Sequence, residues 1–497
     1  MSDRIAKPSD LQSALHAGRL RLPAVLCTAI GAAAPLTVIA GVVTTGYAET
    51  GLIGIPIAFV AVALVLACFT PGYLAMNRTI GNSGAFYSFV SAGLGRPAGV
   101  AAAFTALLAY NALQVGLYGI LGPVTQPLLQ QIGIDVPWWV ISVAAWALVA
   151  LLGVLSISIS GRVITWLLAA EIAVICLFTV GNLAHPADGT LALASLDPGN
   201  LIGPGAGAVL VLGILAFVGF EAPAVYSEET RDPHRTIPAA TYLAIGVVGL
   251  LYTVGSWALA STVGPDHIAQ RSAEQGQDLL FTLAAEHFGE TVSTIGRVLL
   301  VTSLLVAAIA FHNTPSRYLF ALGREKVLPA RCGDTWRRTD APIIGSITQS
   351  ALGITVIVVY AAAGWDPLVT LFYWAGTAGG LGILILLTAT SLAVLAHLLR
   401  QTRAGNHSRV TTLITTTLAS AFLVTIVIAA GANLPSLFGV TADSPIVTAV
   451  LAAYLVTILT GLAWALNLRR SRPAAYRAIG LGAKTDTVTD TERTISA

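Results

Sequence analysis

The sequence predicts an all-α polytopic membrane protein with twelve transmembrane helices. Of its 497 residues, 56% are hydrophobic and only 10% are charged, whereas soluble globular chains carry about 25% charged residues. The mean hydropathy is +0.80. Apolar segments of roughly 20 residues, the length that a spanning helix needs, recur along the chain. The twelve expected spans lie near residues 24–48, 52–73, 98–126, 137–156, 162–182, 205–229, 238–262, 292–319, 343–363, 367–398, 411–432 and 446–468.

The distribution of Lys and Arg predicts that both termini lie in the cytoplasm. With this orientation, all of the 26 basic residues except Arg271 and Arg297 fall on the inner side of the membrane. Basic loops are retained on the cytoplasmic side of membrane proteins. We therefore expect a multi-pass protein of the cell membrane, with a cytoplasmic N-terminal segment (1–22) and a cytoplasmic, disordered C-terminal tail (469–497). The outer loop near 263–290 has helical periodicity and predicts a packed lid helix.

Several function classes find no support in the sequence. No basic tract of the size that nucleic acid needs is present. The four cysteines are not spaced as metal ligands or as a disulfide framework. No pairing of a nucleophile with a base indicates an enzyme. We expect no metal and no cofactor.

The sixth span contains an acid, a glycine and a proline within five residues. Glu221 is flanked by Gly219 and Pro223 in the run GILAFVGFEAPAVYSEE. Glycine weakens a helix, and proline is tolerated only in its first turn. We expect one helix to end near Phe217 and a second to begin near Phe220. Glu221 would then lie in a first turn, where the helix dipole favours a negative charge.

The first span is interrupted in a similar way. Gly31 and Pro35 break an apolar run near its centre, and Ala34, which precedes the proline, is pushed away from helical geometry. The two spans run in opposite directions through the membrane. Interrupted spans at corresponding places in two inverted halves indicate the binding site of a secondary transporter. The alternative is a pair of independent proline kinks without a site.

Four stretches carry a resemblance to a known family. They are GAAAPLTVIAG (31–41), TIGNSGAFYSFVSAGLGRPAG (79–99), FVGFEAPAVYSEETRDPHRTIPAA (217–240) and FHNTPSRYLFALGREKVLP (311–329). In this order and spacing they resemble the amino acid–polyamine–organocation permeases. The resemblance implies a LeuT-type fold with two inverted repeats of five spans, at about 23–182 and 205–398. This 23–398 transport core is followed by spans 11 and 12 in 399–468.

The resemblance also implies a substrate site formed by exposed backbone at the two breaks. Carbonyl groups that end a half-helix suit an ammonium group, and N–H groups that begin one suit a carboxylate. The implied residues are Gly31, Ala32, Ala33, Ala34 and Leu36 in span 1 and Phe217, Val218, Gly219 and Phe220 in span 6. Pro35 and Glu221, which mark the breaks, are included with them. Tyr110 in span 3 is a further candidate to line the path, and a hydrogen bond between helices is its alternative role. This chain has A-A-A-P where the family more often has G-S-G, so an amine or polyamine is an alternative to an amino acid.

Glu171 is the second acid within a predicted span. Intramembrane acids are costly and often lie on ion pathways. In many sodium-independent members of the family a lysine fills the matching place. We expect Glu171 to couple transport to protons, with a coordinated sodium ion as the competing account. The alternative is an acid that is simply hydrogen-bonded to the broken span 1.

The acid pair Glu228–Glu229 follows span 6 at a helix C-terminus, where the dipole disfavours negative charge. We expect these acids to pair with inner arginines, and the candidates are Arg78, Arg317 and Arg324.

The sequence as a whole predicts a secondary active importer of amino acids or related amines, driven by a proton gradient. The nearest alternative is an exchanger of the same compounds on the same fold. An alternative from another class is a membrane sensor or partner subunit that does not transport. The expected partners are a small-molecule substrate and the lipid bilayer, without nucleic acid.

Overall fold

The computed structural model confirms the all-α class. It describes residues 20–482, apart from 81–83, 155–156, 204, 228, 336–340 and 404–409. Within this part of the chain the regular elements are helices, and the strand-like pairings are two isolated bridges, Leu20 with Thr230 and Thr335 with Pro342.

The expected spans are all found as helices. Ten helices in the described residues are long and apolar enough to cross a membrane. The fourth expected span is the shorter apolar helix α7 (Trp138–Val154), and the sixth is interrupted after α9 (Ala206–Ala216). In lipid a backbone polar group finds no water partner, so a spanning segment of this composition folds as a helix.

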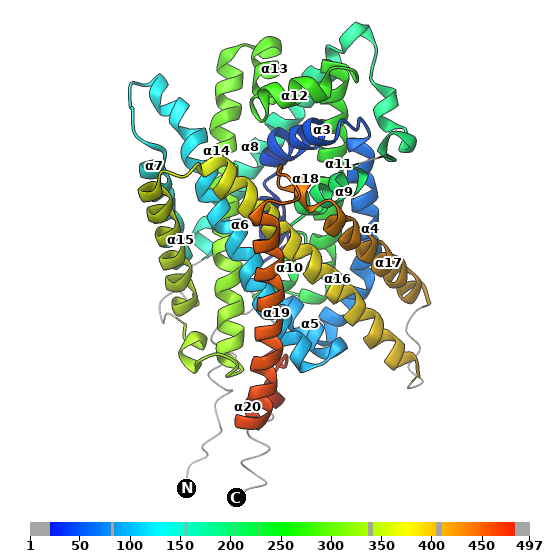
Figure 1. Cartoon of the computed structure of the whole chain (residues 1–497), viewed down its shortest axis with the longest axis vertical. Helices are drawn as coiled ribbons and strands as arrows, with labels where there is room; N and C mark the ends of the chain where they lie inside the picture. Colours follow the sequence, from blue (N-terminus) through cyan, green and yellow to red (C-terminus); the bar gives the residue numbers. More distant parts are fainter. Residues whose placement is uncertain are drawn as a thin grey trace, which may run out of the picture.

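The helices follow one another in two halves and a C-terminal pair (Figure 1). Span 1 is built from α1 (Leu22–Ala33), α2 (Pro35–Thr37), η1 (Val38–Val42) and α3 (Val43–Thr50). The rest of the first half contains α4 (Ile55–Thr79), α5 (Ala85–Leu94), α6 (Arg96–Gln131), α7 and α8 (Ile157–Ala184). The two halves are connected by η2 (Ala187–Gly189), η3 (Leu193–Leu196) and η4 (Pro198–Leu201). The second half contains α9, α10 (Ala222–Val225), α11 (Pro233–Val263), α12 (Ile268–Gln275), α13 (Asp278–Phe288), α14 (Glu290–Arg324), η5 (Ala330–Gly333), α15 (Ile343–Ala363), η6 (Pro367–Tyr373) and α16 (Trp374–Arg403). The chain ends with α17 (Val410–Ala432), α18 (Leu434–Leu437), α19 (Pro445–Ser471) and α20 (Pro473–Ala478).

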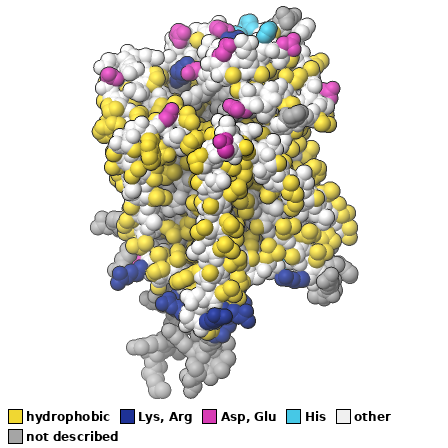
Figure 2. Space-filling model, in the orientation of Figure 1, with side chains coloured by type: hydrophobic (Ala, Val, Ile, Leu, Met, Phe, Trp, Pro, Cys, Tyr) yellow, Lys and Arg dark blue, Asp and Glu magenta, His cyan; other side chains and the backbone are white. Residues whose placement is uncertain are grey.

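The broken spans lie inside the bundle. The two halves of span 1 pack against α8, α10, α11 and α14, while α7 with α15 and α17 occupy opposite sides in Figure 1. Helix α20, the last helix of the described residues, lies at one end of the bundle. On the face shown in Figure 2, Lys and Arg gather mainly at that end, and Asp and Glu gather at the other. We call these the terminal end and the acidic end.

The lid predicted for the outer loop is present as α12 and α13. Leu279, Leu280 and Phe281 of α13 are buried, and the Ser293 hydroxyl of α14 donates to the Phe281 carbonyl at 2.8 Å. The lid packs onto the second half of span 1, since α12 contacts α3 and α13 contacts η1. The packed lid helix is therefore confirmed.

The C-terminal segment differs from the expected disordered tail between 469 and 482. Helix α19 continues to Ser471 and α20 follows it. The N–H groups of Gly480 and Gly482 then donate to the two carboxylate oxygens of Glu325 at 2.8 and 2.7 Å. Glu325 is buried at the end of α14 and needs donors, which explains why this stretch is held. Residues 483–497 lie outside the described residues.

Candidate substrate site at two helix breaks

The first break is formed by Ala34. Helix α1 ends at Ala33, Ala34 adopts a left-handed conformation (φ 46°, ψ 66°), and Pro35 begins α2. The Ala34 N–H returns to the Gly31 carbonyl at 3.2 Å. An L-residue in this conformation costs roughly 1–2 kcal/mol, so the surrounding contacts must hold it. The interruption predicted at Pro35 is present.

The second break covers residues 217–221. Helix α9 ends at Ala216, Gly219 is left-handed (φ 119°), and Glu221 is the N-cap of α10. The second helix begins at Ala222 rather than near Phe220. The reason is a succession of tight turns, in which the Phe220 N–H bonds to the Phe217 carbonyl at 3.1 Å and the Ala222 N–H to the Gly219 carbonyl at 2.9 Å.

The two breaks lie against each other. A Cβ atom on Gly219 would lie 2.7 Å from the Ala32 Cβ and 2.8 Å from the Ala29 carbonyl oxygen. A Cβ on Gly31 would lie 2.7 Å from the Val306 Cγ1 of α14. Glycine and alanine thus allow backbone to meet backbone here, and the residues expected from spans 1 and 6 are brought together.

Glu221 stabilises the break in span 6 by hydrogen bonds. Its Oε2 accepts from the Gly219 N–H at 2.9 Å, and its Oε1 accepts from the Tyr110 hydroxyl of α6 at 2.7 Å. The Tyr73 hydroxyl of α4 donates to the Glu221 carbonyl at 3.3 Å. Both carboxylate oxygens are therefore occupied, and Tyr110 is joined to the break as a supporting residue.

Glu171 reaches the other break from α8. Its Oε1 accepts from the Leu36 N–H at 2.8 Å and from the Ser303 hydroxyl of α14 at 2.7 Å. Among the described residues no donor is bonded to its Oε2. The Tyr252 hydroxyl of α11 donates to the Ala33 carbonyl at 3.2 Å on the other side of the break. The hydrogen bond to the broken span 1 is thus present, and proton or cation coupling stays a prediction.

The site is closed at the terminal end. Arg317 of α14 donates to both carboxylate oxygens of Glu229, from Nε at 2.9 Å and from Nη2 at 3.3 Å. Its guanidinium lies 4.4 Å from the centre of the Tyr226 ring. This confirms Arg317 as the partner of Glu229, whereas Glu228 lies outside the described residues. The Leu20 backbone pairs with residues 229 and 231, so the start of span 1 is tied to the same point.

A cavity of about 300 Å³ lies on the acidic side of the breaks. Its lining includes Glu49 of α3, Leu212 of α9, Tyr373 of η6 and Asn433. Helices α3 and α9 are the halves of spans 1 and 6 that lie beyond the breaks. All the break residues themselves are buried and none of them lines the cavity, so the site at the breaks is closed.

Sequence reasoning missed Ser303, Glu49 and His312 as parts of this region. His312 of α14 lies 3.1 Å through Nδ1 from the Gln114 Nε2 of α6, and 2.8 Å through Nε2 from the Ser346 Oγ of α15. A buried histidine in an apolar span was a signal that could have been used. Ser303 resembles the many other small polar residues of the spans, so no pattern distinguishes it.

A comparison with known protein families shows to which family this chain belongs. The family model described as amino acid permease matches residues 20–462. The chain belongs to the amino acid permease family. This confirms the resemblance that the four sequence motifs carried.

Several curated relatives are similar in sequence to parts of this permease. An uncharacterized transporter of Mycobacterium tuberculosis is 28% identical over 165 residues, which cover 32% of this chain and 36% of the relative. The lysine-specific permease LysP of Lactococcus lactis is 24% identical over 272 residues (50% and 53%). The low-affinity putrescine importer PlaP of Escherichia coli is 24% identical over 337 residues (63% and 70%). The match thus spans from about a third to about two thirds of these relatives.

Proposed function

We propose that this permease is a secondary active importer of amino acids or related amines, driven by protons. The observation that carries the proposal is the contact of two broken helices beside a buried carboxylate, Glu171, with one oxygen bonded to the break. The family supports a small-molecule substrate carried across a membrane. Two of its relatives are named for lysine and putrescine, which share an ammonium group at the end of an aliphatic chain.

The breaks can bind such a group by their backbone. The last carbonyls of α1 lack partners within the helix, and Tyr252 occupies that of Ala33. Carbonyl oxygens of the neighbouring alanines are the acceptors proposed for the substrate ammonium. For an amino acid, the carboxylate would be held by N–H groups that begin the following half-helix, where it would replace Glu171 at the Leu36 N–H or Glu221 at the Gly219 N–H.

The acidic end is proposed as the extracellular side. The basic residues at the terminal end then lie in the cytoplasm, as the positive-inside tendency requires. Glu49 in the outer cavity would attract a cationic substrate before the lid region opens. The Arg317–Glu229 pair would have to part when the site opens to the cytoplasm.

Proton coupling through Glu171 follows from its position at three helices. Its Oε1 holds Leu36 of span 1 and Ser303 of span 8, so protonation weakens attraction for both. A ligand or proton moves a conformational equilibrium only by interacting differently with the two states. Loss of the negative charge at this junction supplies such a difference.

A thermal-shift screen tests the substrate class. The purified permease would be mixed with amino acids and with polyamines, because a ligand that binds only the native state raises its stability. We expect at least one compound of these classes to raise the Tm. In Pro35→Ala, where the helix can continue through the break, the shift should be lost at normal expression. An equal shift in the variant would contradict a site at the breaks.

Uptake by the permease reconstituted in proteoliposomes then distinguishes proton-driven import from exchange. An imposed inward proton gradient without sodium should drive accumulation into empty proteoliposomes. Uptake that requires a preloaded substrate would favour the exchanger, and strict dependence on sodium would favour a coordinated sodium ion.

A further inference from the structure

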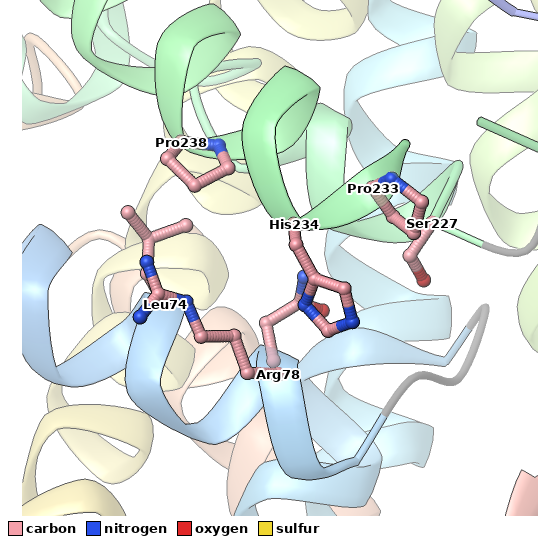
Figure 3. A pocket seen from close by; sticks show the side chains of 7 residues that line it. Leu74, Arg78, Ser227, Pro233, His234 and Pro238 are labelled. Atoms are coloured by element: carbon pink, nitrogen blue, oxygen red, sulfur yellow. The ribbon is translucent and has the colours of Figure 1, made fainter. Parts of the chain in front are cut away.

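A second cavity opens at the terminal end of the bundle, away from the helix breaks. It has a volume of about 220 Å³ and lies between α4, the segment after α10, and the start of α11. Its lining includes Asn77 and Arg78 of α4, Ser227, and His234 and Pro238 of α11. In Figure 3 Arg78 lies on α4 and His234 on the facing α11, and the Arg78 side chain is directed toward Leu74.

The cavity carries the positive charge of Arg78, which forms no ion pair with another residue in the described part of the chain. The ion pairs in that part of the chain use Arg271, Arg297 and Arg317, and Arg78 is in none of them. Arg78 and His234 are both exposed, so their donors are available to a ligand. An arginine with free N–H groups suits the planar, multiple recognition of a phosphate.

Two buried polar side chains in the lining also lack partners among the described residues. The Oδ1 of Asn77 and the Oγ of Ser227 have no hydrogen-bond partner there, and the two residues are only 9% and 8% exposed. A buried polar atom without a partner is unfavourable. A ligand with a hydroxyl group and an acceptor oxygen would satisfy both, because Ser227 can donate and Asn77 Oδ1 can accept.

The first turn of α11 adds a further donor. The N–H groups of Arg235 and Thr236 bond to the Asp232 carbonyl, Pro233 has no N–H, and no side chain in the described part of the chain caps this helix start. The N–H of His234 has no backbone partner in the described residues. A helix start with a free N–H and a positive dipole end favours an anion.

The surface beside the cavity is the one that a lipid chain would cover. Helices α4 and α11 pack along each other. Beyond Pro238 they expose Leu64 (61%), Leu243 (44%) and Leu250 (66%). A headgroup in the cavity can therefore continue into acyl chains on an apolar helix surface, which a free phosphate cannot do.

We propose that this cavity binds the headgroup of an anionic glycerophospholipid, phosphatidylglycerol, from the leaflet at the terminal end. The phosphate contacts Arg78, His234 and Ser227, and a glycerol hydroxyl donates to Asn77. The cavity joins spans 2 and 7 to the end of span 6, so the bound lipid stabilises their arrangement. The site does not depend on which substrate the permease carries.

Binding is tested on the detergent-purified full chain by native mass spectrometry and thermal unfolding. The probes are dioctanoyl phosphatidylglycerol, dioctanoyl phosphatidylcholine, and soluble glycerol 3-phosphate. We expect phosphatidylglycerol alone to raise the Tm. In Arg78→Gln its affinity should fall about five-fold, the usual effect of one basic residue near an anionic lipid. The control is Arg235→Gln, which removes a neighbouring charge of α11 outside the cavity lining and should retain the wild-type affinity.

Three results would overturn the proposal. Equal stabilisation by phosphatidylcholine would show a contact with acyl chains rather than a headgroup site. An equal shift with glycerol 3-phosphate would show a site for soluble phosphate. Equal losses in Arg78→Gln and Arg235→Gln would show general attraction to a basic surface. Ser227→Ala serves as a second variant should Arg78→Gln fold poorly, and it should also weaken phosphatidylglycerol binding.

Discussion

The break in span 1 and the break in span 6 each contain one left-handed residue, Ala34 or Gly219, and each has a backbone N–H bonded to a buried carboxylate. The carboxylates come from different places. Glu221 belongs to the break in span 6, and its two carboxylate oxygens accept hydrogen bonds from the Gly219 N–H and the Tyr110 hydroxyl. Glu171 comes from another span and bridges the break to α14 through a single oxygen.

Glu221 therefore stabilises the break to which it belongs, whereas the charge of Glu171 acts on helices of other spans. Protonating Glu221 would disturb its own break and the hydrogen bond that this carboxylate accepts from Tyr110 of α6. Protonating Glu171 would disturb three spans together, and its second oxygen has no bonded donor among the described residues. The comparison therefore indicates a supporting role for Glu221 and favours Glu171 for the coupling role that we propose.

The largest effect is expected from adding a side-chain atom at the point where the two breaks touch. Gly219→Ala adds a Cβ within 2.8 Å of span 1 and requires a left-handed alanine. Overpacking and backbone strain each cost about 1–3 kcal/mol. The variant should lose ligand binding and unfold at a lower temperature.

Gly246→Ala is the matched control for this change. A Cβ on Gly246 of α11 meets no atom within 4 Å, and alanine is favoured over glycine in a helix by roughly 0.5–1 kcal/mol. Its Tm and binding should equal or exceed those of the wild type. Normal binding in Gly219→Ala would show that the breaks need not touch.

A smaller effect is expected from Glu221→Gln. The amide oxygen can still accept from the Gly219 N–H, and the NH2 group can donate to the Tyr110 hydroxyl, so both hydrogen bonds lose their charged acceptor. A hydrogen bond to a charged group contributes about 1.5–3 kcal/mol. Transport should fall at every pH while expression and fold are retained, as measured by uptake and by size-exclusion chromatography. Near-normal uptake would mean that the acid is incidental.

The smallest effects are expected from two substitutions that each remove a hydroxyl group. Ser303→Ala removes a donor to Glu171, and Tyr110→Phe removes a donor to Glu221. Each removes one donor from one carboxylate. Loss of a donor makes the ionised form of Glu171 less favourable, so the pH midpoint of uptake should move upward in Ser303→Ala. In Tyr110→Phe the rate should fall several-fold with an unchanged midpoint. A shifted midpoint in both variants, or in neither, would remove the distinction between the two acids.

Much of this arrangement could be predicted from the sequence. Gly31, Pro35, Gly219 and Pro223 interrupt apolar runs, and helix-breaking residues act locally, so the breaks could be located. The hydrogen bonds across the fold could not be derived in the same way. Glu171 and Ser303 are 132 residues apart, and only the packing of α8 against α14 decides that they meet.

The C-terminal segment shows the same limit. Its polar composition favours disorder, yet Gly480 and Gly482 donate to Glu325 because a buried acid at the end of α14 needs partners. Nothing in the local sequence of either segment indicates the other. The cavity beside Arg78 likewise depends on two helices that are distant in the chain.

Proton-driven accumulation by Glu171→Gln measures the central claim most directly. Glutamine retains an oxygen for the Leu36 N–H but cannot gain or lose the proton. In proteoliposomes with an imposed inward proton gradient and no sodium, the wild type and Glu221→Gln should both concentrate substrate, the latter more slowly. Glu171→Gln should exchange substrate across the bilayer without concentrating it. Accumulation by Glu171→Gln at the wild-type level would contradict the account, because coupling would then reside elsewhere.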